Sequence, residues 1–231
     1  MSRRQGELEL GYLNRVPMRR EQTSDGSVGT GLIAAVVLLV GLLSGCGATR
    51  PAKYYQLTIP PDAAAAAVEK PDTVPVSLLL GAVMTSHLYR EDRIVYGNGP
   101  EQLGTYEYQR WAEPPAEMIQ EVLLRELRSS GRYRAVHYRR SNMLGDFAIR
   151  GRLYDFKEVD GGQISARVTL ELEMRDLKNG ATVWTHYYTH DEPASGKDVP
   201  AVVAALDKNV QRAVKEVVES LDQYFASHPV K

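Results

Sequence analysis

Cysteine is scarce in this sequence, and the charges of its two signs nearly cancel. One cysteine, Cys46, occurs in 231 residues, which excludes an internal disulfide framework and a cysteine-cluster metal site. The formal net charge is −1, from 28 basic and 29 acidic residues. Nucleic-acid-binding proteins are usually clearly basic, so we expect no nucleic-acid partner. Hydrophobic residues make up 43% of the chain, enough for one medium-sized domain with a substantial core.

Catalytic motifs are missing as well. The sequence contains no HExxH, no GxSxG and no phosphate-binding glycine loop. His186 and His190 have the spacing of a metal-ligand pair, but four residues of a strand span roughly 13 Å, too far for both to bind one ion. We interpret Asp191 and Glu192 as a solvated turn after that strand. The sequence therefore predicts neither an enzyme nor a metal site, although scattered residues can also assemble an active site.

A short apolar run lies near the N-terminus. Residues 31–43 read GLIAAVVLLVGLL and carry no charge. This run is short for a membrane-spanning helix, which needs about 20 residues, but it is typical of the apolar region of a signal peptide. Arg19 and Arg20 precede it as a positively charged segment. We predict a signal peptide over residues 1–45, with Met18 as an alternative start that gives the signal a more usual length.

The cysteine follows directly. Leu43, Ser44, Gly45 and Cys46 match the bacterial lipobox: an aliphatic residue, two small residues and a cysteine. The small residues let the peptide bond before Cys46 enter a signal peptidase, and the thiol takes a diacylglycerol through a thioether. The new amine is then acylated, and three acyl chains anchor stably where one holds only marginally. We predict lipid attachment at Cys46, with these acyl groups and no other cofactor. The alternative is a buried free cysteine behind an apolar helix.

The segment after the cysteine differs from the rest of the chain. Gly47, rather than an aspartate, follows Cys46, which under the usual bacterial sorting rule favours the periplasmic face of the outer membrane. Residues 46–75 are rich in proline, alanine and charge, so we expect a lipidated tether with little fixed structure. Residues 54–57 are a candidate short extended piece within it. The folded domain should occupy residues 76–226.

Several segments of that domain have the pattern of β-strands. Residues 76–84 form a continuous apolar run, typical of a strand that is buried on both faces. Residues 164–176 alternate between apolar and polar side chains, which predicts one buried and one wet face. Asn179-Gly180 is a strong hairpin signal, and residues 181–190 should form the strand after it. Further candidate strands cover residues 93–98, 104–111, 133–138 and 146–159.

Two segments have helical periodicity. One helix should begin at Pro114-Pro115 and end before Gly131, because proline suits a first turn and glycine commonly follows a last one. The other covers roughly residues 198–226, with apolar side chains at three- or four-residue spacing. We therefore predict a single three-layer α/β domain, with a mixed sheet of about five strands packed against two main helices.

Three aromatic residues share one candidate strand. Tyr106 and Tyr108 lie on the same face of it, and Trp111 lies at its end. Amphipathic rings suit an interface, so these residues are our candidate surface for a protein or lipid partner. The alternative is a sheet face packed under a helix, which is the commoner role of such residues. The same two readings apply to Trp184 and Tyr188.

Several of these segments together resemble a known family. They are the lipobox, Lys53-Tyr54-Tyr55-Gln56-Leu57, the stretch YEYQRWAEPPAEMIQEVLLRELRSSGRYRAV at 106–136, and the alternating strand, Asn-Gly hairpin and C-terminal helix that follow. This pattern is similar to the ABC-type transport auxiliary lipoproteins, the group of paraquat-inducible lipoprotein C. The resemblance covers about residues 54–225, and its most specific part runs from Trp111 to Pro115.

The resemblance implies a role without catalysis. Members of this family work in the Gram-negative envelope beside an ABC permease and ATPase and an MCE-domain substrate-binding protein. Such systems are thought to move phospholipids or other hydrophobic molecules, and the lipoprotein is thought to dock the transporter at the outer membrane. The family fold is a three-layer α/β domain, and only Cys46 carries over as a site. A homo-oligomeric ring would suit a ring-shaped MCE partner, although no residue here demonstrates one.

Two other functions fit the same sequence features. A structural envelope lipoprotein that binds peptidoglycan or an outer-membrane assembly would have a similar lipobox and α/β domain. A lipid-anchored hydrolase would need a nucleophile and a base that the fold brings together. The expected function is therefore an accessory of envelope transport, with the structural lipoprotein as the alternative.

Overall fold

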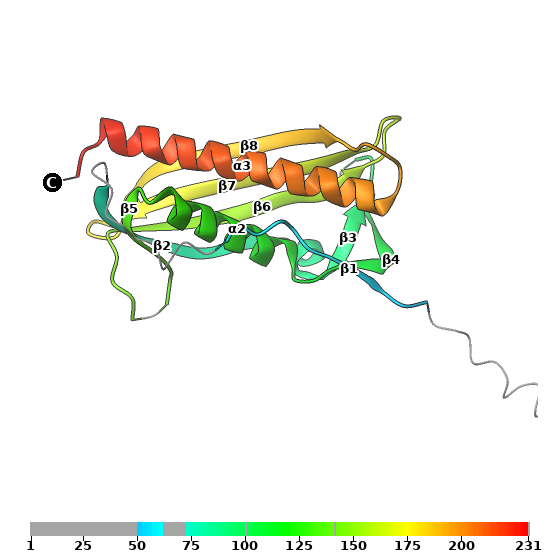
Figure 1. The fold of residues 1–231 in the computed structure, drawn as a ribbon, viewed down its shortest axis with the longest axis horizontal. Coiled ribbons are helices and arrows are strands. Elements are labelled where there is room, and N and C mark those ends of the chain that lie inside the picture. Colours follow the sequence, from blue (N-terminus) through cyan, green and yellow to red (C-terminus); the bar gives the residue numbers. More distant parts are fainter. Residues whose placement is uncertain (1–49, 62–72, 100, 141, 231) are drawn as a thin grey trace, which may run out of the picture. The chain divides into compact units, whose positions relative to one another are not determined.

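A mixed sheet carries the fold (Figure 1). The computed structural model describes residues 50–61, 73–99, 101–140 and 142–230. Within these residues the sheet has eight strands, three more than the expected five, so the predicted α/β class is confirmed and the strand count was too small. The strands are β1 (Lys53–Tyr55), β2 (Val74–Thr85), β3 (Arg93–Tyr96), β4 (Gly104–Trp111), β5 (Tyr133–Tyr138), β6 (Phe147–Val159), β7 (Ser165–Asp176) and β8 (Thr182–Pro193).

The other strands are arranged around β6. β7 pairs antiparallel with it from Phe147 to Val159, and β8 pairs antiparallel with the far side of β7. On the other side of β6, β2 pairs in parallel with the first half of the strand and β3 pairs in parallel with Lys157 and Glu158. On that side of β6 the sheet therefore continues as two separate groups of strands. β2 leads to β5, and β3 leads through β4 to β1.

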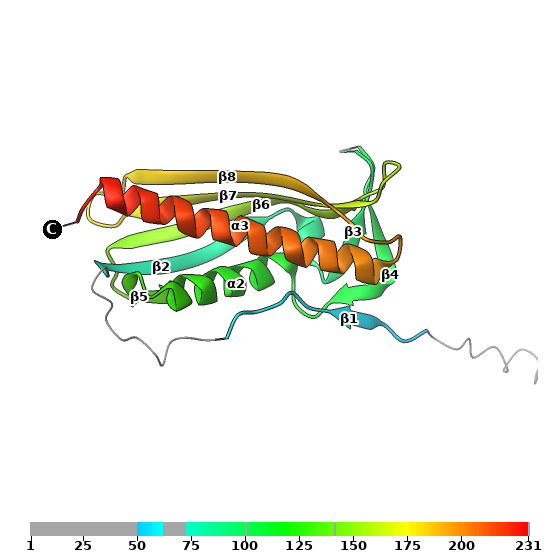
Figure 2. The same cartoon turned by 45° about the horizontal axis from the view of Figure 1, so that its top comes forward.

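Two long helices cover one face of this sheet (Figures 1 and 2). α2 (Pro115–Ser130) packs on β2 and β5, and α3 (Val199–Ser227) packs on β7 and β8 and touches α2. The opposite face of the sheet carries surface ion pairs, among them Arg150–Glu173 and Arg167–Asp191. The described elements therefore form two layers, and the prediction of three layers was wrong. Periodicity gives a helix its apolar stripe but does not tell which face of the sheet the stripe will meet.

The core lies between the sheet and the helices. The alternation in β7 is confirmed: its apolar side chains point into the core, and none is more than 2% exposed. The apolar stripes of α2 and α3 meet them from the other side. The buried side chains of β7 are Ala166, Val168, Leu170, Leu172 and Met174.

Local signals fix the ends of several elements. The Asp198 carboxylate accepts a hydrogen bond from the Ala201 backbone N–H at 3.1 Å and so caps α3. Gly131 ends α2 in the left-handed region, at a φ of 62°. Asn179-Gly180 lies in the hairpin between β7 and β8 as predicted, with Gly180 at a φ of 75°. Within the described part of the chain, no helix is both long and apolar enough to cross a membrane.

The ordered domain extends further toward the N-terminus than predicted. Lys53–Tyr55 pairs with β4, and Leu57 is only 3% exposed. The backbone N–H and hydroxyl of Thr58 both donate to the Asp207 carboxylate on α3, at 2.9 and 2.7 Å. Residues 53–60, which we call the N-terminal strap, therefore belong to the folded domain and not to a loose tether. Residues 46–49 and 62–72 of the predicted tether lie outside the described residues.

Candidate functional site

A groove opens between the strap, β2 and the start of α2. Its volume is about 950 Å³. The short 3₁₀ helix η1 (His87–Arg90) closes one side of it. Its walls are mostly apolar and include partly exposed side chains. Among its lining residues are Ile59, Met84, Tyr89, Glu117, Met118 and Tyr138.

The groove exists because β2 is longer than its neighbour β5. β5 ends at Tyr138, opposite Leu80. Beyond that point β2 pairs only with β6, through Val83, Met84 and Thr85. The Gln120 side-chain amide donates to the Gly81 carbonyl at 3.0 Å and holds α2 beside this part of the strand. The floor of the groove is therefore a strand segment with one side unpaired among the described residues, the kind of edge that can bind an extended peptide.

The groove carries charges of both signs. The Tyr138 hydroxyl donates to the Glu121 carboxylate, and Arg125 pairs with the same group. The Tyr138 hydrogen bond and Arg125 hold the pKa of Glu121 below its usual value, while burial and Glu121 raise the pKa of Tyr138. Glu121 is therefore ionised and already paired. Glu117 and Arg90 are exposed, and within the described residues no side chain pairs with either, so they can meet a ligand.

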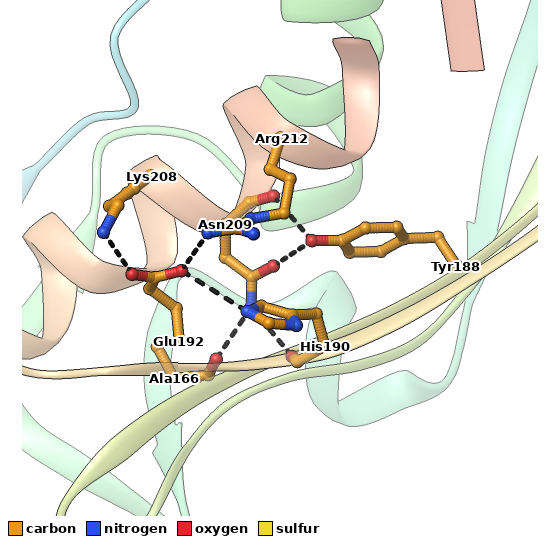
Figure 3. Close-up of polar contacts among 7 residues, drawn as sticks. All are labelled: Ala166, Tyr188, His190, Glu192, Lys208, Asn209 and Arg212. Atoms are coloured by element: carbon orange, nitrogen blue, oxygen red, sulfur yellow. Dashed lines mark hydrogen bonds and ion pairs between the residues drawn. The ribbon is translucent and has the colours of Figure 1, made fainter. Parts of the chain in front are cut away.

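A second polar cluster is buried under α3 (Figure 3). Asn209 is 0% exposed, and its side-chain amide donates to the carbonyls of Ala166 and His190, both at 2.8 Å. The Tyr188 hydroxyl donates to Asn209 Oδ1 at 2.5 Å. Burial raises the pKa of that hydroxyl, so it remains a neutral donor. Every polar atom of the Asn209 side chain is satisfied within the protein, which makes this cluster a fastening of α3 to β7 and β8.

A buried carboxylate lies beside it. Glu192 is 4% exposed and forms ion pairs with Lys208 and with Arg212, the latter at 2.8 Å (Figure 3). The hydrogen bond from Lys208, together with Arg212, holds the pKa of the Glu192 carboxyl below its usual value. The prediction of a solvated turn at Asp191 and Glu192 was wrong, because both residues are in β8 and α3 covers Glu192. An ionised carboxylate neutralised by two cations is a structural feature and not a free acid or base.

The two strand histidines do not form a ligand pair. His186 stacks on Trp184, with ring centroids 5.9 Å apart, and burial lowers its pKa. His190 lies 3.4 Å from Glu192. No group of three or more side chains suited to hold a metal occurs among the described residues. The expectation that both histidines have ordinary strand roles agrees with this arrangement.

The predicted aromatic surface divides between core and surface. Trp111 is 1% exposed and packs on Phe156 at a centroid distance of 5.2 Å, so it belongs to the core and cannot contact a partner. The Tyr106 hydroxyl donates to Glu158 at 2.8 Å. Tyr106 and Tyr108 are both half-buried. Trp111 must therefore be removed from the candidate surface, and the two tyrosines alone remain in it.

The predicted lipobox cannot be placed in the fold. Leu43, Ser44, Gly45 and Cys46 all lie outside the described residues. The residues that line the groove were not foreseen, because their proximity depends on strand lengths and helix placement. Asn209 was missed too, although an amide inside the apolar stripe of α3 is a signal that sequence reasoning can use.

Comparisons with known proteins give the fold and the family. The fold is similar to the crystal structure of a protein from Xanthomonas campestris, with a TM-score of 0.61, 21% identity, and coverage of 72% of this chain and 92% of that one. A second crystal structure, of an uncharacterized protein, has a TM-score of 0.58 and 14% identity over 74% of this chain and 99% of its own. These likenesses concern the fold alone. No curated protein matches significantly.

A family model gives the assignment. The model of the ABC-type transport auxiliary lipoprotein component matches residues 55–218, from the end of β1 well into α3. The family is one of transport auxiliaries and not a known family of enzymes, in agreement with the missing catalytic motifs. A lipoprotein family implies a lipid-anchored location in the cell envelope and association with an ABC transport system. The chain belongs to the family of ABC-type transport auxiliary lipoprotein components.

Proposed function

We propose that this protein is a lipid-anchored periplasmic accessory of an MCE/ABC-type transport system for phospholipids or other hydrophobic molecules. The observation that carries the proposal is the family match over residues 55–218, preceded by a lipobox at Cys46. The protein catalyses no step and docks the transporter at the outer membrane. Gly47, which follows the cysteine, supports a location at the outer membrane.

The mechanism follows from tethering. Acyl chains on Cys46 hold the domain at the membrane surface, and a partner that reaches the domain is held there with it. Tethering of this kind raises the effective concentration of a partner without any new contact. The groove is the docking surface in this proposal, because it combines an unpaired strand segment with exposed charges of both signs, Glu117 and Arg90.

In-cell photocrosslinking tests both parts of the proposal. A photoreactive amino acid replaces Met84, which is 57% exposed in the groove, in a C-terminally tagged full-length chain. Leu144, which is 94% exposed in the loop before β6, is the matched control site. We expect crosslinks from position 84 to the MCE-domain protein, identified by mass spectrometry, and none from position 144.

The anchor is tested in the same experiment. The Cys46→Ala variant should lose the crosslink from position 84, because the domain is no longer held at the membrane. Crosslinks only to cell-wall components or outer-membrane assembly proteins would overturn the proposal in favour of a structural lipoprotein. Equal crosslinks to the MCE-domain protein from positions 84 and 144 would leave the docking role intact and refute the groove as its surface.

A further inference from the structure

A small cavity lies on the face of the sheet away from the helices, beside the β7–β8 hairpin. The hairpin is at the end of the domain opposite β1 (Figures 1 and 2), and the cavity shares no lining residue with the groove. Its volume is about 160 Å³. Pockets for drug-sized molecules have about 300–1,000 Å³, so this cavity suits one small chemical group. Three of its lining residues are arginines: Arg139 directly follows β5, Arg150 lies in β6 and Arg175 lies in β7.

The register of the sheet explains how the cavity forms. Arg175 is the ladder partner of Ala148, and Arg150 lies two residues further along β6, on the same face. Ala148 is short among these long side chains, so it forms the floor of the cavity. On the other side, the backbone N–H of Arg139 donates to the Leu80 carbonyl at 2.8 Å and extends the pairing of β5 with β2. Neighbouring parts of one sheet therefore bring three cations to one small hole.

Two of the three guanidinium groups are held in place by the protein. The Nε of Arg150 pairs with the Glu173 carboxylate. Arg175 donates from Nε and Nη2 to the Gly180 carbonyl, at 3.1 and 2.6 Å. A guanidinium has five N–H donors, so both arginines keep donors beyond these contacts. Their positions are therefore fixed before a ligand arrives, which reduces the entropy cost of binding.

The third arginine is not neutralised by the protein. Among the described residues, no side chain forms an ion pair with Arg139. Both carboxylates around the cavity have other partners: Glu173 pairs with Arg150, and Asp176 accepts hydrogen bonds within its own hairpin, at 2.8 and 3.2 Å. The cavity therefore has an excess of positive charge and of N–H donors, and the like charges repel one another unless an anion lies between them.

We propose that this cavity binds a phosphate group, with Arg139, Arg150 and Arg175 as the residues that hold it. Arginine forms paired hydrogen bonds with phosphate oxygens, and three guanidinium groups match the several oxygens of a tetrahedral phosphate better than the two of a planar carboxylate. A lipid headgroup and a soluble phosphate ester present the same kind of group, and the cavity has room for that group alone. The rest of either ligand extends outside the cavity.

Calorimetric titration of the full-length protein in non-ionic detergent with inorganic phosphate tests the site. We expect saturable binding that weakens as salt is added, because the contacts are between charges. Arg139→Gln should weaken binding roughly tenfold or more, since it removes charge-assisted hydrogen bonds. Arg140→Gln is the matched control: it removes the same charge from a neighbouring residue that does not line the cavity, so it should change the Kd by less than about twofold. No saturable binding, or an equal loss in both variants, would overturn the proposal.

A second variant tests the cavity itself without a change of charge. Ala148→Leu places a larger apolar side chain on the floor of the cavity and should weaken phosphate binding by a similar factor to Arg139→Gln. Arg139 is exposed, so its replacement should leave the fold unchanged, and the melting temperature of each variant without phosphate checks this. Unchanged phosphate binding in a folded Ala148→Leu variant would refute the cavity as the site.

Further ligands identify the source of the phosphate group. Glycerol phosphate represents a soluble ester, and dihexanoylphosphatidylglycerol below its critical micelle concentration represents a lipid headgroup. Each is also titrated into Arg139→Gln, which corrects for partition of the lipid into detergent. Tighter binding of the lipid assigns the site to lipid headgroups, and tighter binding of glycerol phosphate assigns it to soluble esters. Acetate should compete with inorganic phosphate roughly tenfold more weakly or less, and equal competition by acetate would refute the preference for phosphate.

Discussion

Replacing Asn209 by alanine should loosen α3 from the rim of the sheet. Asn209 joins the helix to both edge-side strands, since its amide donates to carbonyls of β7 and β8 and its oxygen accepts from Tyr188. Alanine removes these three hydrogen bonds, and the buried Tyr188 hydroxyl keeps only its longer contact, 3.3 Å, with the main-chain carbonyl of residue 209. Because the site is 0% exposed, water cannot take its place without opening the interface.

The size of the loss follows from these contacts. Each hydrogen bond contributes about 0.5–1.5 kcal/mol net, and a buried group left unsatisfied costs about 1–3 kcal/mol more. Alanine is a better helix former than asparagine and recovers up to about 0.7 kcal/mol. We expect the free energy of unfolding of Asn209→Ala to fall by about 3 kcal/mol, a large share of the stability of a typical domain.

Urea unfolding followed by far-UV circular dichroism and tryptophan fluorescence measures this change. Trp184 is a suitable probe because its indole N–H donates to Ser220 across the same interface, at 3.1 Å. Gln223→Ala, at an exposed site of α3, is the matched control and should change the stability by less than about 0.5 kcal/mol. A loss below about 1 kcal/mol in Asn209→Ala would refute the fastening role of Asn209.

Three further predictions concern the core, a close contact and the buried carboxylate. Trp111→Ala should destabilise the protein by about 3–5 kcal/mol in the same unfolding assay, because it empties a fully buried site. Gly151→Ala should cost about 1–3 kcal/mol, since the added methyl overlaps the Leu172 side chain. The pKa of Glu192 is depressed in the folded state, so its stabilising effect is present above the usual glutamate value of about 4.3 and is lost as the pH falls through the folded value. The melting temperature, measured between neutral and acid pH, should therefore fall less on acidification in Glu192→Gln than in the natural protein.

Local patterns in the sequence predicted most of the elements. Residues 104–111 and 133–138 were expected as strands and form β4 and β5 with the same bounds. The alternation of β7 predicted its buried face correctly. Successive side chains of a strand point to opposite faces of the sheet, so the row of apolar residues identifies the face that is buried. Gly131 and the Asn179-Gly180 turn lie where backbone chemistry requires them.

Long-range relations were predicted less well. β1 has only 3 residues, too few for any periodicity, so its pairing with β4 follows from the fold and not from its own pattern. The position of both helices on one face likewise has no local signature. Glu192 was expected in solvent because its cationic partners, Lys208 and Arg212, come later in the chain, on α3. The groove depends on the unequal lengths of β2 and β5, which no single segment encodes.

The N-terminal strap has a mechanical consequence. A pull on the chain ahead of Lys53 reaches β1 first, and a force along that strand loads its contacts with β4 together, in shear. Behind β1, Thr58 is bound to Asp207 and the Pro60 carbonyl to Arg125, so tension is shared with both long helices before it can reach β2. The contacts of the strap therefore bear tension on the N-terminal end of the domain before it reaches β2 and the strands beyond it.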